Sequence, residues 1–179
     1  MDPNTRSRIV ASIAEFRLPT YQEIPDVGLY LEQTAKYISD YLSPVQDMPV
    51  TGSMISNYVK KGLIAKPVRK QYGREQIAQL MFIAVAKMVL SMDDVHLMIS
   101  IQRQTYPSQI AYDYFRTELR QVLDSVFSRE SALSALEADA PDQKVMLRNT
   151  IIALAHKIYL DKLFAVIRED RSQAGETEK

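Results

Sequence analysis

Residues 54–80, MISNYVKKGLIAKPVRKQYGREQIAQL, decide the fold that the sequence predicts. The apolar residues at the start of this stretch share one face of a short helix: Met54, Ile55, Tyr58 and Val59. Thr51 or Ser53 can cap this helix, because a side-chain hydroxyl accepts a hydrogen bond from a free N–H of the first turn. Gly62 stands where a helix C-terminus favours a residue that tolerates positive φ. We therefore expect a short helix over about 51–61.

Three features follow this glycine. The apolar pair Leu63-Ile64 is expected to return to the core, whereas residues 65–73 are short, basic and interrupted by Pro67. This basic segment can form a two-stranded hairpin, the only β structure that the sequence suggests. From Ile77 to Val89, apolar residues recur at the i, i+3, i+4 and i+7 spacing of an amphipathic helix. The succession predicts a short helix, a basic wing and a supporting helix.

Helical patterns flank this stretch on both sides. Five glycines among 179 residues are few for a chain built from strands and tight turns. Apolar spacing and prolines place the remaining helices at about 2–16, 29–42, 91–104, 109–127 and 142–169, with an extended connector at 18–28, room for a short turn of helix at 132–136 and a frayed tail after 170. The sequence therefore predicts an all-α fold in two parts, a winged helix-turn-helix domain over 1–106 and a C-terminal helical domain over 107–179.

Composition excludes several kinds of chemistry. The chain has no cysteine, which rules out disulfides, thiolate zinc sites and cysteine nucleophiles. We find no phosphate-binding glycine loop and no nucleophile elbow, and His96 and His156 lie far apart without a second histidine at metal-ligand spacing. The N-terminus has no secretory signal, and the longest apolar run, 80–86, is far shorter than the ~20 residues of a membrane helix. We expect a cytoplasmic, non-enzymatic protein without cofactor, metal or membrane partner.

Charge is distributed unevenly along a chain whose formal net charge is zero. Six basic residues and no acidic residue lie between Thr51 and Arg74, so the rest of the chain carries a net charge of −6. A compact cationic segment on an anionic body produces a directional field that attracts a polyanion to one place. Lysine and arginine gain affinity for duplex DNA by releasing its counterions. The charge pattern therefore favours double-stranded DNA as the partner.

The stretch from residue 29 to 102 resembles the winged helix-turn-helix of MerR-type transcription regulators. The likeness is strongest at 58–64, YVKKGLI, and at 90–95, LSMDDV. The whole chain resembles an uncharacterised bacterial family, catalogued only as a domain of unknown function, whose N-terminal half is MerR-like. The resemblance implies that Tyr58, Lys70 and Tyr72 contact the DNA backbone. The chain departs from the MerR pattern at Ser56-Asn57, where an arginine–tyrosine pair is usual, and in a longer turn over 43–50.

The predicted function is that of a sequence-specific DNA-binding transcription regulator. In helix-turn-helix proteins the second helix enters the major groove, which here is the helix at 51–61, and the wing at 65–74 would lie on the DNA backbone. Asn57 is the best candidate to read a base, because its amide can bond bidentately to adenine. The predicted DNA-binding residues are Thr51, Ser53, Ser56, Asn57, Tyr58, Lys60, Lys61, Lys66, Arg69, Lys70, Tyr72 and Arg74. For Tyr58 and Tyr72, packing in the core is an equally good interpretation.

The last helix, 142–169, is apolar around most of its circumference. Such a helix must be covered on more than one side, so we expect a homodimer interface, with a central core helix as the alternative. Two other functions stay open. One is a helical adaptor that binds a protein and no DNA. The other is a regulator that also senses a small molecule in an apolar pocket among its C-terminal helices, with candidate lining residues Tyr106, Tyr112, Tyr114, Phe115, Phe127, Tyr159 and Phe164.

Overall fold

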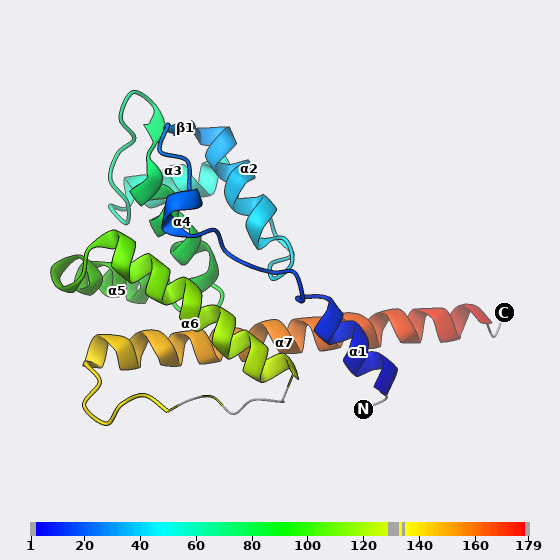
Figure 1. The fold of residues 1–179 in the computed structure, drawn as a ribbon. Helices are drawn as coiled ribbons and strands as arrows, with labels where there is room; N and C mark the ends of the chain where they lie inside the picture. Colours follow the sequence, from blue (N-terminus) through cyan, green and yellow to red (C-terminus); the bar gives the residue numbers. More distant parts are fainter. Residues whose placement is uncertain (1–2, 129–132, 134, 178–179) are drawn as a thin grey trace.

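The computed structural model describes residues 3–128, 133 and 135–177 (Figure 1). The described residues form seven α-helices: α1 (Pro3–Ala11), α2 (Leu31–Leu42), α3 (Gly52–Lys60), α4 (Arg74–Ala86), α5 (Met92–Thr105), α6 (Ser108–Ser128) and α7 (Asp142–Thr177). A 3-10 turn, η1 (Tyr21–Glu23), precedes α2. Two short antiparallel strands, β1 (Leu29–Tyr30) and β2 (Gln71–Tyr72), make the one described sheet. The mostly helical fold with a small sheet confirms the predicted fold class at that level.

Helix α4 lies at the centre of the molecule. Its side chains from Ile77 to Ala86 are buried except for the partly buried Phe82, so this part of α4 is covered on all sides rather than on one face. Helices α2, α6 and α7 pack around it. In Figure 1, α2, α3 and the sheet lie on one side of α4, whereas α6 and α7 lie on the other. Helix α4 therefore provides the buried surface that supports the elements around the basic segment.

Several helix ends match the sequence patterns. The Thr51 hydroxyl accepts a hydrogen bond from the Met54 backbone N–H at 3.2 Å and caps α3. Gly62 has a φ of 74°, which ends the helix in the left-handed conformation that glycine adopts without strain. Ser91 caps α5 in the same way as Thr51 caps α3, by accepting from the Asp94 N–H at 3.1 Å. These predicted boundaries are confirmed.

Other boundaries differ from prediction. Helix α1 ends at Ala11 rather than near Phe16, because the chain tightens into turns whose amides bond three residues back, although Ile13 and Phe16 are buried as their spacing requires. Helix α7 continues to Thr177 instead of fraying after Asp170. Arg8 of α1 explains part of this extension, since it binds Glu169 and Asp170, each at 2.6 Å. The helical turn expected at 132–136 falls partly outside the described residues, and 133, 135 and 136 are not helical.

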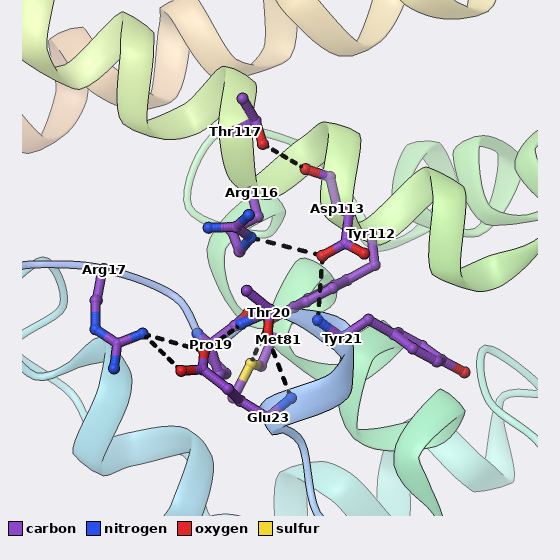
Figure 2. Close-up of polar contacts among 10 residues, drawn as sticks. All are labelled: Arg17, Pro19, Thr20, Tyr21, Glu23, Met81, Tyr112, Asp113, Arg116 and Thr117. Atoms are coloured by element: carbon purple, nitrogen blue, oxygen red, sulfur yellow. Dashed lines mark hydrogen bonds and ion pairs between the residues drawn. The ribbon is translucent and has the colours of Figure 1, made fainter.

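The connector between α1 and β1 is tied to α6 (Figure 2). The Tyr112 hydroxyl lies 3.1 Å from both the Pro19 carbonyl oxygen and the Met81 sulfur, and the Asp113 carboxylate accepts from the Tyr21 N–H at 3.1 Å. Helix α1 also packs along α7, and α4 contacts both α6 and α7. Contacts thus cross the boundary expected at residues 106–107, and the two-domain division stays a prediction. Among the described helices, none is both long and apolar enough to cross a bilayer.

Candidate nucleic-acid interface

Helix α3 presents one polar face to solvent. Ser53, Ser56, Asn57 and Lys60 are all exposed, and their spacing of i, i+3, i+4 and i+7 places them along one side of the helix. The opposite side buries Ile55 completely and leaves Tyr58 only 4% exposed. A helix with this division lies on the body of the protein with its polar row facing outward. The row has the geometry that a groove-binding helix needs.

The turn between α2 and α3 is fixed by a side chain of α2. The Ser39 hydroxyl donates to the Val50 carbonyl at 3.2 Å and accepts from the Val50 N–H at 2.9 Å. Two bonds to one residue hold the chain just before α3 against α2, although the turn over 43–50 is long. No sequence pattern indicates this bridge, since a serine within a helix can bond in many other ways.

Gly52 lets the first turn of α3 approach α2 closely. A Cβ atom at this position would overlap the Glu32 carboxylate and lie 3.1 Å from the Leu31 Cγ. Glycine is unfavourable inside a helix by about 1 kcal/mol relative to alanine, so its presence at the first helical position is the signal that could have indicated this contact. Glu32 also brings a negative charge to the N-terminus of α3, where the helix dipole stabilises it.

The basic segment folds into a very short hairpin. Val68 and Gln71 exchange both backbone hydrogen bonds, at 3.0 and 2.9 Å, around the two-residue tip Arg69-Lys70. Both tip residues have positive φ, 51° and 66°, as a primed hairpin turn requires. Residues other than Gly, Asn and Asp rarely adopt this backbone conformation, which costs them roughly 1–2 kcal/mol per residue. Two strongly charged residues thus occupy a turn that is locally unfavourable for them.

The expected two-stranded wing within 65–73 is only partly correct. Between Val68 and Gln71 there is a single bridge, and the sheet itself joins β2 to β1, with Leu29 opposite Tyr72 and Tyr30 opposite Gln71. Gly28 permits this pairing, because a Cβ there would come within 2.6 Å of the Gln71 Cβ. The sequence analysis expected residues 29–30 at the start of α2, but they form β1 and pair with β2 of the wing. The hairpin is therefore supported from outside its own segment.

Arg74 has a structural position that the sequence did not predict. Its Nε donates to the Ile24 carbonyl at 2.7 Å, Nη1 donates to the Gln22 side chain at 3.2 Å, and the guanidinium lies 5.8 Å from the Tyr21 ring centroid. These contacts tie the start of α4 to the connector. A phosphate would have to compete with these contacts for the guanidinium, and the assignment of Arg74 to DNA binding stays a prediction.

Tyr58 and Tyr72 are both buried, each 4% exposed. Burial raises the pKa of each phenol above its ordinary value, because the phenolate is poorly solvated there. Both residues belong to the hydrophobic core, as the packing interpretation required. A direct contact of these rings with DNA has no support from their positions.

Five cations of the segment remain exposed: Lys60, Lys61, Lys66, Arg69 and Lys70. Within the described part of the chain, none of the five forms an ion pair with a carboxylate. In Figure 1 the loop that follows α3 and carries most of them projects from the top of the molecule, away from α7. We call these five residues and the exposed row of α3 the basic head. An unopposed cluster of this kind attracts a polyanion.

Comparison with known proteins finds one family. A domain of unknown function (DUF1836) matches residues 19–115, which span the connector, the basic head and α4 to the first part of α6. No curated protein and no solved structure matches the chain.

Proposed function

The chain belongs to the DUF1836 family, and we propose that it is a sequence-specific DNA-binding transcription regulator with a MerR-like winged helix-turn-helix. One observation carries the proposal. The exposed row of α3 lies beside five cations that no carboxylate of the described residues opposes. Helix-turn-helix proteins use this combination, with a short helix in the major groove and cations on the flanking phosphates.

The roles within the basic head follow from side-chain chemistry. Asn57 lies in the middle of the exposed row, where its amide can donate to and accept from an adenine edge. Ser53 and Ser56 can bond to a base or to a phosphate. Arg69 and Lys70 at the hairpin tip would lie on the backbone beside the groove, where they add affinity without choosing a sequence. The strain held at this tip is consistent with selection for charge rather than for stability.

We further propose that the regulator is a homodimer formed through α7. Ile151, Leu154 and Ile158 of this helix are buried inside the protomer, as the core-helix interpretation requires. Leu160 and Phe164, one turn apart, are nevertheless 44% and 48% exposed. A second copy would cover them. A two-fold dimer presents two copies of α3 to successive turns of the major groove, so its DNA site would be an inverted repeat.

Selection of bound duplexes from a random pool, at two salt concentrations, tests the proposal. We expect an enriched inverted repeat whose affinity falls steeply with salt. Asn57→Ala should relax specificity at one base pair, at a cost of about 1–3 kcal/mol, whereas Lys70→Ala should weaken all sequences and lower the salt slope by about one. Arg168→Ala, a change of equal charge on α7, is the matched control, and its oligomeric state is compared with that of wild type because Arg168 lies one turn beyond Phe164. A DNA affinity that does not change with salt concentration or with Lys70→Ala would refute the proposed DNA-binding function. A protein partner bound in stoichiometric amounts would identify the chain as an adaptor instead.

A further inference from the structure

A large apolar cavity lies between α4, α5, α6 and the first two turns of α7. Its volume is about 280 Å³. The cavity is a cleft with an open side, since Ile110 at its rim is 58% exposed, and a concave apolar surface of this kind is typical of small-molecule sites. A cavity of about 150 Å³ in another protein is large enough to bind benzene. The space here therefore suits a molecule of about two fused rings, or an acyl chain of similar volume.

Aromatic and sulfur-containing side chains make up much of the wall. Phe82 of α4 and Phe115 of α6 meet edge to face, with centroids 5.2 Å apart, and Met98 and Met146 approach from α5 and α7. Of the aromatic residues that the sequence suggested for a pocket, Tyr106, Tyr112, Tyr114 and Phe115 line this cavity, whereas Phe127, Tyr159 and Phe164 do not. A wall of this composition binds an apolar body.

Lys144 is the single charged residue among the described residues that line the cavity. It comes from the first turn of α7, and its ammonium lies 5.5 Å from the centroid of the Tyr114 ring, also on the wall. Amide and hydroxyl groups supply the other polar atoms of the wall: Gln79, Gln102, Thr105, Ser108, Gln143 and the tyrosines Tyr106, Tyr112 and Tyr114. A cation beside an apolar space, without a lining carboxylate, is complementary to an organic acid.

The cavity wall is also bonded to the end of α3. Gln79, which is 9% exposed, accepts a hydrogen bond from Arg103 Nη2 at 3.2 Å through its Oε1 atom. The same Nη2 atom donates to the Leu63 carbonyl at 2.9 Å, immediately after the Gly62 turn that ends α3. An occupant that shifts Gln79 therefore acts on the segment that sets the position of the basic head.

We propose that this cavity binds a small carboxylic acid with an aromatic or aliphatic body, held by Lys144, and that Gln79 and Arg103 transmit its occupancy to α3. The binding site stands on its own geometry, whereas the regulatory consequence rests on the proposed function. The chemistry of the site specifies an acid of this size and not a particular metabolite. A second route to the basic head exists through Tyr112, which lines the cavity and contacts the connector at Pro19 (Figure 2).

Methyl NMR of the full chain tests binding without DNA. The probe is 2-naphthoate, and 2-naphthamide is its neutral control. We expect saturable shifts of the Met98 and Met146 methyl signals with naphthoate, and binding at least tenfold weaker with the amide. Lys144→Gln should remove that preference while leaving amide binding unchanged. Ala111→Trp, which fills the space from α6, should abolish both. Absence of saturable shifts, or equal naphthoate affinity in wild type and Lys144→Gln, overturns the site.

Affinity for a selected duplex, with and without saturating naphthoate, tests the coupling. We expect a change of at least fivefold in wild type that disappears in Arg103→Met, although Arg103→Met still binds naphthoate in the NMR titration. Naphthoate binding without any effect on duplex affinity would overturn the coupling and leave the site. Naphthoate binding by a chain that selects no duplex would contradict the proposed function alone, so the two failures are distinguishable.

Discussion

Arg103 of α5 donates a hydrogen bond of 2.9 Å to the carbonyl oxygen of Leu63, and thereby joins a helix outside the basic head to the residue that follows the α3 turn. The Leu63 N–H donates a hydrogen bond of 3.0 Å to the Tyr58 carbonyl, so both backbone groups of Leu63 are hydrogen-bonded. A buried carbonyl that loses a charged donor costs about 1–3 kcal/mol.

Arg103→Met is therefore expected to lower the free energy of unfolding by about 1–3 kcal/mol, measured by urea denaturation. Methionine keeps most of the length of the side chain and removes the donors. Arg168→Met, at an exposed position on α7, is the control and should change stability by less than about 0.5 kcal/mol. Equal effects of the two substitutions would show that the Leu63 bond contributes nothing to stability.

Residues better suited to the turn at the tip of the hairpin should raise the stability of the protein and lower its affinity for DNA. Arg69→Asn combined with Lys70→Gly places the preferred residues of a primed turn at the two positions with positive φ. We expect the free energy of unfolding to rise by about 1 kcal/mol, because part of the left-handed strain is relieved. Duplex affinity should fall, and the salt slope should decrease by about two.

The control for this variant removes the same charge elsewhere. Arg168→Gln combined with Arg171→Gln changes two exposed arginines of α7 and should leave both the salt slope and the hairpin unaffected. Because both residues lie on the same face of α7 as Leu160 and Phe164, the variant is first shown to keep the oligomeric state of wild type. If the tip variant were no more stable than wild type, the positive φ values at residues 69 and 70 would not cost the folded protein free energy.

Local patterns in the sequence were sufficient to predict the helices, but they could not predict which distant segments pair with each other. The capping residues Thr51 and Ser91 and the turn at Gly62 act within a few positions, and the structure has them where the patterns predict. Tyr72 of β2 pairs with Leu29, 43 positions earlier in the chain, and nothing in the residues from 65 to 73 specifies this partner. For the same reason the charge count could not indicate that the side chain of Arg74 bonds back to Gln22 and Ile24.

Acid should weaken the connector at Glu23. Its carboxylate accepts from the Thr20 backbone N–H at 2.7 Å and from Arg17 at 3.1 Å (Figure 2). These bonds, the backbone bond first, hold the pKa of the Glu23 carboxyl below its ordinary value of 4.5. A carboxyl whose pKa is lower in the folded state stabilises the fold above the unfolded-state pKa and loses that contribution as the pH falls through the folded-state pKa.

Glu23→Gln should consequently be less stable than wild type at pH 7, and the difference should diminish as the pH is lowered from 5 towards 3. Urea denaturation of both proteins across this range measures it. A difference that stays constant with pH would mean that the charge of Glu23 contributes nothing to the connector.

The ion pair between Glu118 of α6 and Arg148 of α7 should be the costliest single contact to break. The two side chains are 7% and 10% exposed, and Arg148 Nη1 lies 2.7 Å from Glu118 Oε1. Removing one member leaves the other charge desolvated, so Glu118→Gln or Arg148→Met is expected to lower the free energy of unfolding by about 3–5 kcal/mol. Glu118→Leu combined with Arg148→Met should cost far less than the sum of the two single changes, because an apolar pair leaves no buried charge.

Lys157→Gln, which breaks the exposed Lys157–Asp161 pair of α7, is the matched control and should cost less than about 1 kcal/mol. Additive single and double variants in urea denaturation would show that the two charges are solvated independently and that the α6–α7 contact is held by its apolar residues alone.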